Sequence, residues 1–244
     1  MPRLHIFKNE KETCYAFAAW IADLINDTLQ KQERFTVALS GGDTPKALYK
    51  ILANDYSTKI DWSKVHIFWG DERMVSSSNE KNNSVTATHL LIDHVPVSAD
   101  HIHPINNNLP PKEAAVEYEN LLRTYFKHET TFDLVILGMG ESGNLLSLFP
   151  TEDDLIQHKG WVVPVYDRQE DLFKITLTIH AINAASVKAF LLTGKRKEEV
   201  VEKVLKGKYE PEKYPAQLIA TANKEVHWFL DEGAAGKLIR PTVS

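Results

Sequence analysis

The chain has 244 residues, a formal net charge of −5 and 43% hydrophobic residues, a composition typical of a globular protein. Its 28 basic and 33 acidic residues are scattered rather than clustered, which argues against a nucleic-acid partner. No apolar run approaches the roughly 20 residues that span a bilayer and no secretory segment is recognisable, so we expect a cytoplasmic protein with no membrane partner.

Short apolar or β-branched runs alternate with stretches of helical periodicity along the chain. Strands are expected near residues 4, 35, 65, 132, 161, 174, 189 and 226, and helices over 10 to 31, 44 to 53, 111 to 128 and 195 to 206. The first helix carries the single Cys14, which predicts a core residue without a disulfide. The alternation predicts an α/β fold with a mostly parallel sheet covered by helices on both faces. We expect residues 1 to 244 to form a single domain.

In such sheets ligands bind beyond the carboxyl ends of the strands, so the loops that follow the strands are where a site is expected. The first distinctive loop is SGGDTP, after a strand that ends at Ser40. Gly41 and Gly42 let the backbone approach a ligand closely. Ser40 and Thr44 add hydroxyl donors at the start of a helix, which favours anion binding. The alternative is a plain strand-to-helix turn with Thr44 as N-cap and Pro45 in the first helical position.

Charged side chains follow two further expected strands. Asp71 and Arg73 come after the strand at 65, where a guanidinium can grip a phosphate bidentately. Lys195, Arg196 and Lys197 lie at an expected helix start, where cations oppose the helix dipole and a nearby anion would relieve the cost. Each cluster alone is typical of a solvated surface. Three such loops in one sheet together favour a small phosphorylated substrate.

A series of motifs occurs in the order and spacing seen in 6-phosphogluconolactonases. They are SGGDTP, WGDER, the GMG…G…SLFP frame, ITLT followed by INAA, LTGKRK and YPAQLI, and they cover about residues 35 to 231. The chain therefore resembles this family. The resemblance implies the sugar-phosphate isomerase-like, modified Rossmann fold shared with glucosamine-6-phosphate deaminases. It also implies a carboxylic ester hydrolase that converts 6-phosphoglucono-1,5-lactone to 6-phosphogluconate in the oxidative pentose phosphate pathway, without cofactor or metal.

The resemblance also implies which residues form the site, and it exposes several departures. The implied substrate-binding residues are Ser40, Gly41, Gly42, Thr44, Asp71, Arg73, Gly140, Gly143, Lys174 and Lys197. The catalytic positions lie in the family pattern G-x-D-G-H-T-A-S-L-F-P. There Ser142 stands at the position of Asp, and Asn144 at that of the His thought to activate water. Leu145 and Leu146 replace Thr and Ala, and Lys174 occupies a position usually held by Arg.

Asn144 removes the base that lactone hydrolysis is expected to need. A carboxamide cannot take a proton from water near pH 7, and losing a general base typically costs about 10²- to 10⁴-fold in rate. His103 and His180 are possible substitutes, although surface or strand-end roles are more typical of such histidines. Three interpretations stay open: a lactonase with impaired activity, a non-catalytic phosphosugar-binding protein, and a deaminase-type isomerase. The loss of Asp at the Ser142 position argues against the last.

Overall fold

The computed structural model describes residues 2–126, 131–150, 158–220 and 225–239 of the chain. Its strands are β1 (Arg3–Phe7), β2 (Phe35–Leu39), β3 (Val65–Trp69), β4 (Asp71–Arg73), β5 (Ile102–His103), β6 (Leu134–Leu137), β7 (Val162–Asp167), β8 (Leu172–Leu177), β9 (Val187–Leu192) and β10 (Glu225–Asp231). Its α-helices are α1 (Glu10–Leu29), α2 (Asp43–Asp55), α3 (Asn83–Leu90), α4 (Pro111–Tyr125), α6 (Ile179–Ala184), α7 (Glu198–Lys206), α8 (Ala216–Ala220) and α9 (Glu232–Ile239). A 3-10 turn, η4 (Lys195–Lys197), leads into α7.

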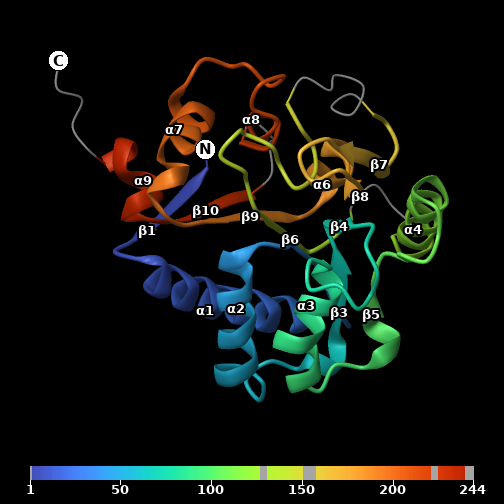
Figure 1. Ribbon diagram of the computed structural model, residues 1–244. Helices are drawn as coiled ribbons and strands as arrows, with labels where there is room; N and C mark the ends of the chain where they lie inside the picture. The colour runs from blue at the N-terminus through green and yellow to red at the C-terminus, as the bar shows by residue number, and fades with distance from the viewer. Residues whose placement is uncertain (1, 127–130, 151–157, 221–224, 240–244) are drawn as a thin grey trace, which may run out of the picture.

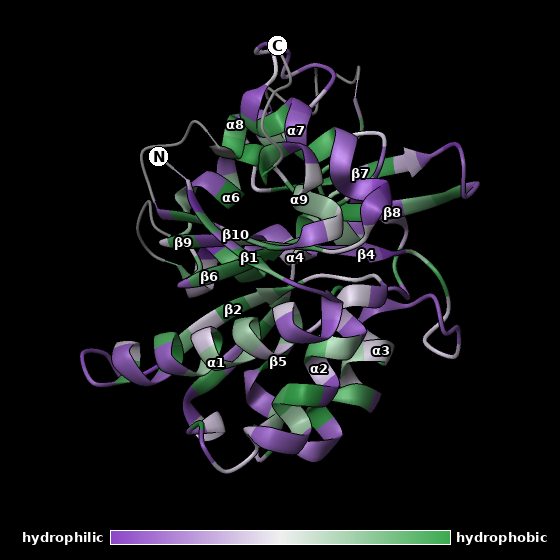
Figure 2. Cartoon of the chain, turned by 90° about the vertical axis from the view of Figure 1, so that its left-hand side faces the viewer, coloured by the Kyte–Doolittle hydropathy of each residue, from purple (hydrophilic) through white to green (hydrophobic). Residues whose placement is uncertain are grey.

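Seven strands form one parallel sheet in the order β1-β10-β9-β6-β2-β3-β5. Figure 1 shows α1, α2 and α3 on one side of this sheet and α7, α8 and α9 on the other. The side view of Figure 2 shows the same two helical layers. The central strands β2, β3, β6 and β9 are buried along their whole length, as expected when helices cover both faces. The predicted α/β fold with a mostly parallel sheet is therefore confirmed.

The expected strands at 161 and 174 belong to a second, antiparallel sheet with the order β4-β8-β7. Only residues 168–171 connect β7 to β8. This connection is too short for a crossover helix, so the two strands must run antiparallel. The segment from Asp71 to Arg73, expected as a loop, is itself the short strand β4, and its pairing places Arg73 directly opposite Lys174 of β8.

Some element boundaries differ from the predictions. The helix expected to reach residue 128 ends at Tyr125, and residues 127 and 128 lie outside the described part of the chain. Helix α2 begins at Asp43 with Gly42 as N-cap, so Thr44, the N-cap in the alternative interpretation of this loop, lies inside the helix. The backbone of Gly42 has a φ of 107°, which glycine adopts readily. Helices α3, α6, α8 and α9 were not predicted, because five to eight residues are too few to establish a helical period.

The core is a single cluster of buried apolar side chains that includes residues of both sheets. Cys14 is fully buried on α1, which confirms its expected place in the core. Within the described ranges, no helix combines the length and the apolar character needed to cross a bilayer.

Three histidines cluster where β3 and β5 meet the end of α4. The ring centroid of His66 lies 3.7 Å from that of His101 and 6.0 Å from that of His103, and His66 shares a hydrogen bond with the hydroxyl of Tyr125. The His66 side chain is well buried, with the residue 8% exposed. Burial, followed by the charges of His101 and Arg34, lowers the pKa of His66 to about 4.

We expect the free energy of unfolding to fall by about 2 kcal/mol between pH 7.5 and pH 5 because the contribution of His66 is lost. Below pH 6.5 the unfolded chain binds a proton at this residue, whereas the folded chain binds it only near pH 4. Its contribution is therefore complete above pH 6.5 and is lost as the pH falls toward 4. Urea unfolding at both pH values measures the loss. Between these two pH values, His66→Gln should lose less stability than the wild type. The control is His180→Gln, because His180 is exposed on α6, and this variant should lose as much stability as the wild type. Equal losses in all three proteins contradict the assignment.

Candidate active site

The loops after four neighbouring strands meet at the carboxyl edge of the main sheet. Strands β9, β6, β2 and β3 are adjacent and parallel. The chain continues from β2 to β3 on one side and from β6 to β9 on the other, so β2 and β6 flank the point where the strand order reverses. Open α/β sheets bind ligands at such a switch point. A cavity of about 540 Å³ lies there.

The cavity gathers nearly all the residues that the sequence pointed to. Those that line it are Ser40, Gly41, Gly42, Thr44, Asp71, Arg73, Gly140, Ser142, Asn144, Lys174 and Lys197. Gly143 is not among the lining residues. Its backbone has a φ of 90°, so its role is in the turn of the altered loop. The structure thus brings the predicted site residues together, and their individual roles in binding and catalysis stay predictions.

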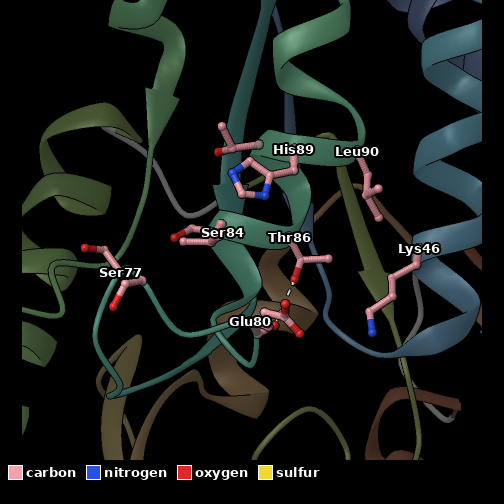
Figure 3. A pocket seen from close by; sticks show the side chains of 10 residues that line it. Lys46, Ser77, Glu80, Ser84, Thr86, His89 and Leu90 are labelled. Carbon is pink, nitrogen blue, oxygen red and sulfur yellow. Dashed lines mark hydrogen bonds between the residues drawn. The ribbon is translucent and has the colours of Figure 1, made fainter.

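A second hollow of about 550 Å³ lies between α2, α3 and the segment at 77–80 (Figure 3). Five of its ten lining residues are serine or threonine, and its titratable side chains are Lys46, Glu80 and His89. Figure 3 shows these three side chains apart from one another, on α2, the loop and α3 respectively. The hydrogen bond drawn there joins the Thr86 hydroxyl to the Glu80 carbonyl at 3.3 Å. Because its polar groups do not converge, we place the functional site at the sheet edge.

The SGGDTP loop brings the N-terminus of α2 to the cavity. Its N-cap, Gly42, makes no side-chain capping bond. A Cβ atom on Gly41 would lie 2.1 Å from Oδ1 of Asn83, so a side chain there would displace the Asn83 carboxamide. The hydroxyl of Thr44 is hydrogen-bonded to that of Thr193 at 3.0 Å, which joins this loop to the one after β9. An uncapped helix N-terminus at the wall favours an anion in the cavity.

The altered loop at 138–149 is held together by Asn144. Its Oδ1 accepts a hydrogen bond from the Ser142 hydroxyl at 3.0 Å, and its Nδ2 donates to the Leu146 carbonyl at 3.1 Å. A Cβ atom on Gly140 would fall 1.8 Å from Oδ1 of Asn144, so a side chain there would displace the Asn144 carboxamide. Leu146 has a φ of 51°, a left-handed conformation that is costly for leucine. The side chains at the implied catalytic positions thus stabilise the loop and offer no proton acceptor near pH 7.

No histidine of the described ranges lines the cavity. His103 lies in the cluster on β5, and His180 is exposed at the start of α6. Neither residue therefore stands in for the missing imidazole. The acidic side chains that line the cavity, within the part of the chain that the structure describes, are Glu10, Asp43, Asp71, Glu141, Asp167 and Glu170.

Asp71 lies between the end of β3 and the altered loop. The Ser147 hydroxyl donates to its Oδ2 at 2.7 Å, and Nδ2 of Asn83 donates to its Oδ1 at 3.4 Å. Burial raises the pKa of Asp71, although the Ser147 hydrogen bond and the charges of Arg73 and Lys174 act in the opposite direction. A carboxylate with a raised pKa is a stronger base. Of the carboxylates in the cavity, Asp71 is best suited to accept a proton.

The cations on the side of the second sheet are already paired with carboxylates. Arg73 donates from Nε and Nη2 to Glu170, and Nζ of Lys174 contacts Glu170 at 2.6 Å and Asp167 at 2.7 Å. Sequence reasoning missed both Glu170 and Asp167. The sequence signal that could have found them is the acidic stretch DRQED between the expected strands at 161 and 174. In a hairpin, the residues of the turn stay close to the ends of the two strands that they connect.

Lys197 reaches the cavity from the opposite side. Its Nζ donates to the Met139 carbonyl at 2.8 Å, which ties η4 to the altered loop. Burial lowers the pKa of Lys197, while the charge of Glu141 acts to raise it. The three basic residues lie in the 3-10 turn, and α7 begins only at Glu198 with acidic residues in its first turn. The expected conflict with the helix dipole is therefore reduced by these acidic side chains.

Known proteins resemble this chain over nearly its whole length. Residues 8–228 match the family profile described as glucosamine-6-phosphate isomerases/6-phosphogluconolactonase. The probable 6-phosphogluconolactonase 2 of Arabidopsis thaliana is 36% identical over 248 residues, which cover 96% of this chain and 94% of that protein. The 6-phosphogluconolactonase of Synechocystis sp. is 32% identical over 245 residues, with 98% and 99% coverage. The crystal structure of the devB protein matches with a TM-score of 0.90 and 29% identity, covering 98% of this chain and 100% of that one.

Proposed function

This chain belongs to the glucosamine-6-phosphate isomerase/6-phosphogluconolactonase family, and on that premise we propose that its cavity hydrolyses 6-phosphoglucono-1,5-lactone to 6-phosphogluconate. The observation that carries the proposal is the convergence of the α2 N-terminus, Lys197 and Asp71 on one cavity of about 540 Å³. A cavity of this size suits a small phosphorylated ligand. The reaction is the hydrolysis of an ester bond. It changes no oxidation state, so it requires no redox cofactor.

In this proposal the phosphate group binds between the N-terminus of α2 and the cationic side chains of the cavity, which are Lys197 on one side and Arg73 and Lys174 on the other. Backbone N–H groups after Gly41 and Gly42, and the hydroxyls of Ser40 and Thr44, are donors of the kind that phosphate sites use. The sugar ring then extends toward the altered loop and Asp71. The uncapped end of α2 and these cationic side chains all line the cavity, which supports this placement.

Asp71 acts as the general base in place of the absent imidazole. Its carboxylate takes a proton from a water molecule that attacks the lactone carbonyl. The bond between the carbonyl carbon and the ring oxygen then breaks, and the ring oxygen takes the proton back from Asp71 to become a hydroxyl of the product. Asn144 and Ser142 occupy the implied catalytic positions without supplying a base, so we propose that activity is impaired relative to relatives with His and Asp there.

Two alternatives use the same cavity: a phosphosugar-binding protein without chemistry, and a deaminase-type isomerase. Purified protein supplied with fresh lactone, and separately with glucosamine 6-phosphate, distinguishes them. We expect lactone loss above the spontaneous rate and no ammonia release. Ammonia release would favour the deaminase. Binding of 6-phosphogluconate without either reaction would favour the binding protein.

Lys197→Ala is expected to weaken 6-phosphogluconate binding by about 1.5 to 3 kcal/mol, the usual range for a hydrogen bond to a charged group. Isothermal titration calorimetry measures the change. Lys206→Ala is the matched control, because Lys206 lies at the far end of α7 and donates to the Leu238 carbonyl at 3.2 Å. Unchanged affinity in Lys197→Ala would place the phosphate elsewhere.

We also propose that residues 1–244 form one domain and that the protein works in the cytoplasm. The single core cluster shared by both sheets supports the first statement. A lone, buried Cys14 fits the reducing conditions of that compartment and supports the second.

A further inference from the structure

The carboxylate of Glu170 lies among the cations of the cavity, in the turn between β7 and β8. It accepts hydrogen bonds from Nε of Arg73 at 3.1 and 3.3 Å, from Nη2 of Arg73 at 3.1 Å and from Nζ of Lys174 at 2.6 Å. Nζ of Lys81 lies 3.8 Å from its Oε2. One side chain, 27% exposed, thus contacts three cations.

Arg73 has little hydrogen-bonding capacity left for a ligand. A guanidinium has five N–H groups. Nε and Nη2 donate to Glu170, and Nη1 donates to Oδ1 of Asn83 at 3.2 Å and to the Lys81 carbonyl at 3.4 Å. Lys174 likewise donates to both Glu170 and Asp167. A phosphate group can therefore reach the face of Arg73 that points to Glu170 only by replacing that carboxylate.

The charge of the cavity opposes a dianionic ligand. Among the described residues, six carboxylates line it against four cationic side chains, Arg73, Lys174, Arg196 and Lys197, a formal excess of two negative charges. Burial acts to raise the pKa of Glu170, but the hydrogen bonds and charges of Arg73 and Lys174 outweigh it and lower the pKa to about 2. Glu170 is thus ionised at any pH near neutrality, and protonation does not release it from the cations.

We propose that Glu170 is an internal counter-anion that a phosphate group must displace from Arg73 and Lys174, so that this residue sets the affinity and the anion selectivity of the cavity. The inference rests on the proposed function, because it takes a phosphate ester as the ligand. A ligand that offers only a carboxylate gains nothing over Glu170 itself. A phosphate dianion brings more charge and three acceptor oxygens, so it competes successfully.

The test compares Glu170→Gln with Glu141→Gln. Both substitutions remove one negative charge from the cavity wall, but Glu141 lies 3.5 Å from the exposed Arg196 and does not hold Arg73 or Lys174. Calorimetric titration with 6-phosphogluconate is expected to show about tenfold tighter binding for Glu170→Gln, because the competing charge beside the phosphate is gone. The more exposed Glu141→Gln should gain less than about threefold.

Selectivity and the rise in melting temperature on adding ligand provide readouts that a merely structural role would not move. The preference for 6-phosphogluconate over gluconate should fall in Glu170→Gln, since a plain carboxylate can then reach Arg73. Without ligand the variant should melt at a lower temperature, because Arg73 and Lys174 lose their counter-ion. The rise in melting temperature on adding 6-phosphogluconate should nevertheless exceed that of the wild type.

Unchanged or weaker binding by Glu170→Gln overturns the inference, and so does an equal gain in Glu141→Gln, which would reveal a general charge effect. If Glu170→Gln does not fold, Glu170→Asp replaces it, since the shorter carboxylate cannot hold both cations. Tighter binding is then expected, and wild-type affinity overturns the inference. Tighter binding of 6-phosphogluconate by Glu170→Gln, with no lactone hydrolysis by the wild type, would support the inference and contradict the proposed function. Lactone hydrolysis by the wild type, with unchanged 6-phosphogluconate binding in Glu170→Gln, would support the proposed function and contradict the inference.

Discussion

A variant that combines Ser142→Asp, Asn144→His, Leu145→Thr and Leu146→Ala is expected to hydrolyse 6-phosphogluconolactone at least about 100-fold faster than the unmodified chain. The reason is that an imidazole with a pKa near neutrality is a far better proton acceptor than a carboxamide. Asn144→His alone should gain less. Ser142 has no carboxylate to orient the ring, and the carboxamide bonds to Ser142 and Leu146 would be lost.

The matched control is the Leu145→Thr and Leu146→Ala double variant, which reshapes the loop without adding a base. It should show no gain in rate, and the melting temperature of both proteins should be recorded, because Leu145 is fully buried and a hydroxyl there is costly. If the unmodified chain turns over the lactone as fast as the four-residue variant, Asn144 does not lie at the chemical centre.

Asp71→Asn is expected to lower kcat/KM for the lactone by about 100-fold or more, since a positioned general base contributes 10²- to 10⁴-fold. Asparagine has nearly the same shape and can still accept the Ser147 hydrogen bond, so the loop should keep its structure. The loss should therefore fall on kcat, and the affinity for 6-phosphogluconate should not fall. Steady-state kinetics together with calorimetry separate the two effects.

Asp43→Asn is the control for charge, because Asp43 is an exposed carboxylate of the same cavity that pairs with Lys46 at 3.1 Å. Its effect on kcat should be less than about threefold. In the four-residue loop variant, Asp71→Asn should cost less than in the unmodified chain, because the imidazole then accepts the proton. A wild-type rate in Asp71→Asn would show that another group is the base.

The parallel sheet was predictable because buried runs such as FTVAL and AFLL alternate with helical periods long enough to cross over. The second sheet was not, because apolar periodicity identifies strands without saying which strands pair. The short connection at 168–171 held that information, since it leaves no room for a crossover helix. Gly42 likewise took the N-cap position from Thr44 through a backbone conformation that the sequence pattern does not specify.

Most of the cavity could be predicted because its residues follow strands whose carboxyl ends meet at one edge. Glu170 could not, because its place beside Arg73 depends on the pairing of β4 with β8 and of β8 with β7. Nor does the family pattern reveal that Asn144 holds Ser142 and Leu146, since this depends on the fold of the loop. The departures from the family pattern identified this loop as altered, and the hydrogen bonds of Asn144 show that it stabilises the loop.

The most direct test is the initial rate at which purified protein opens freshly prepared 6-phosphoglucono-1,5-lactone, with the spontaneous rate in the same buffer subtracted. We predict a rate that rises with protein concentration, saturates with lactone and falls when 6-phosphogluconate competes for the cavity. A rate equal to the spontaneous one at every protein concentration, while 6-phosphogluconate still binds, would contradict the proposed hydrolysis.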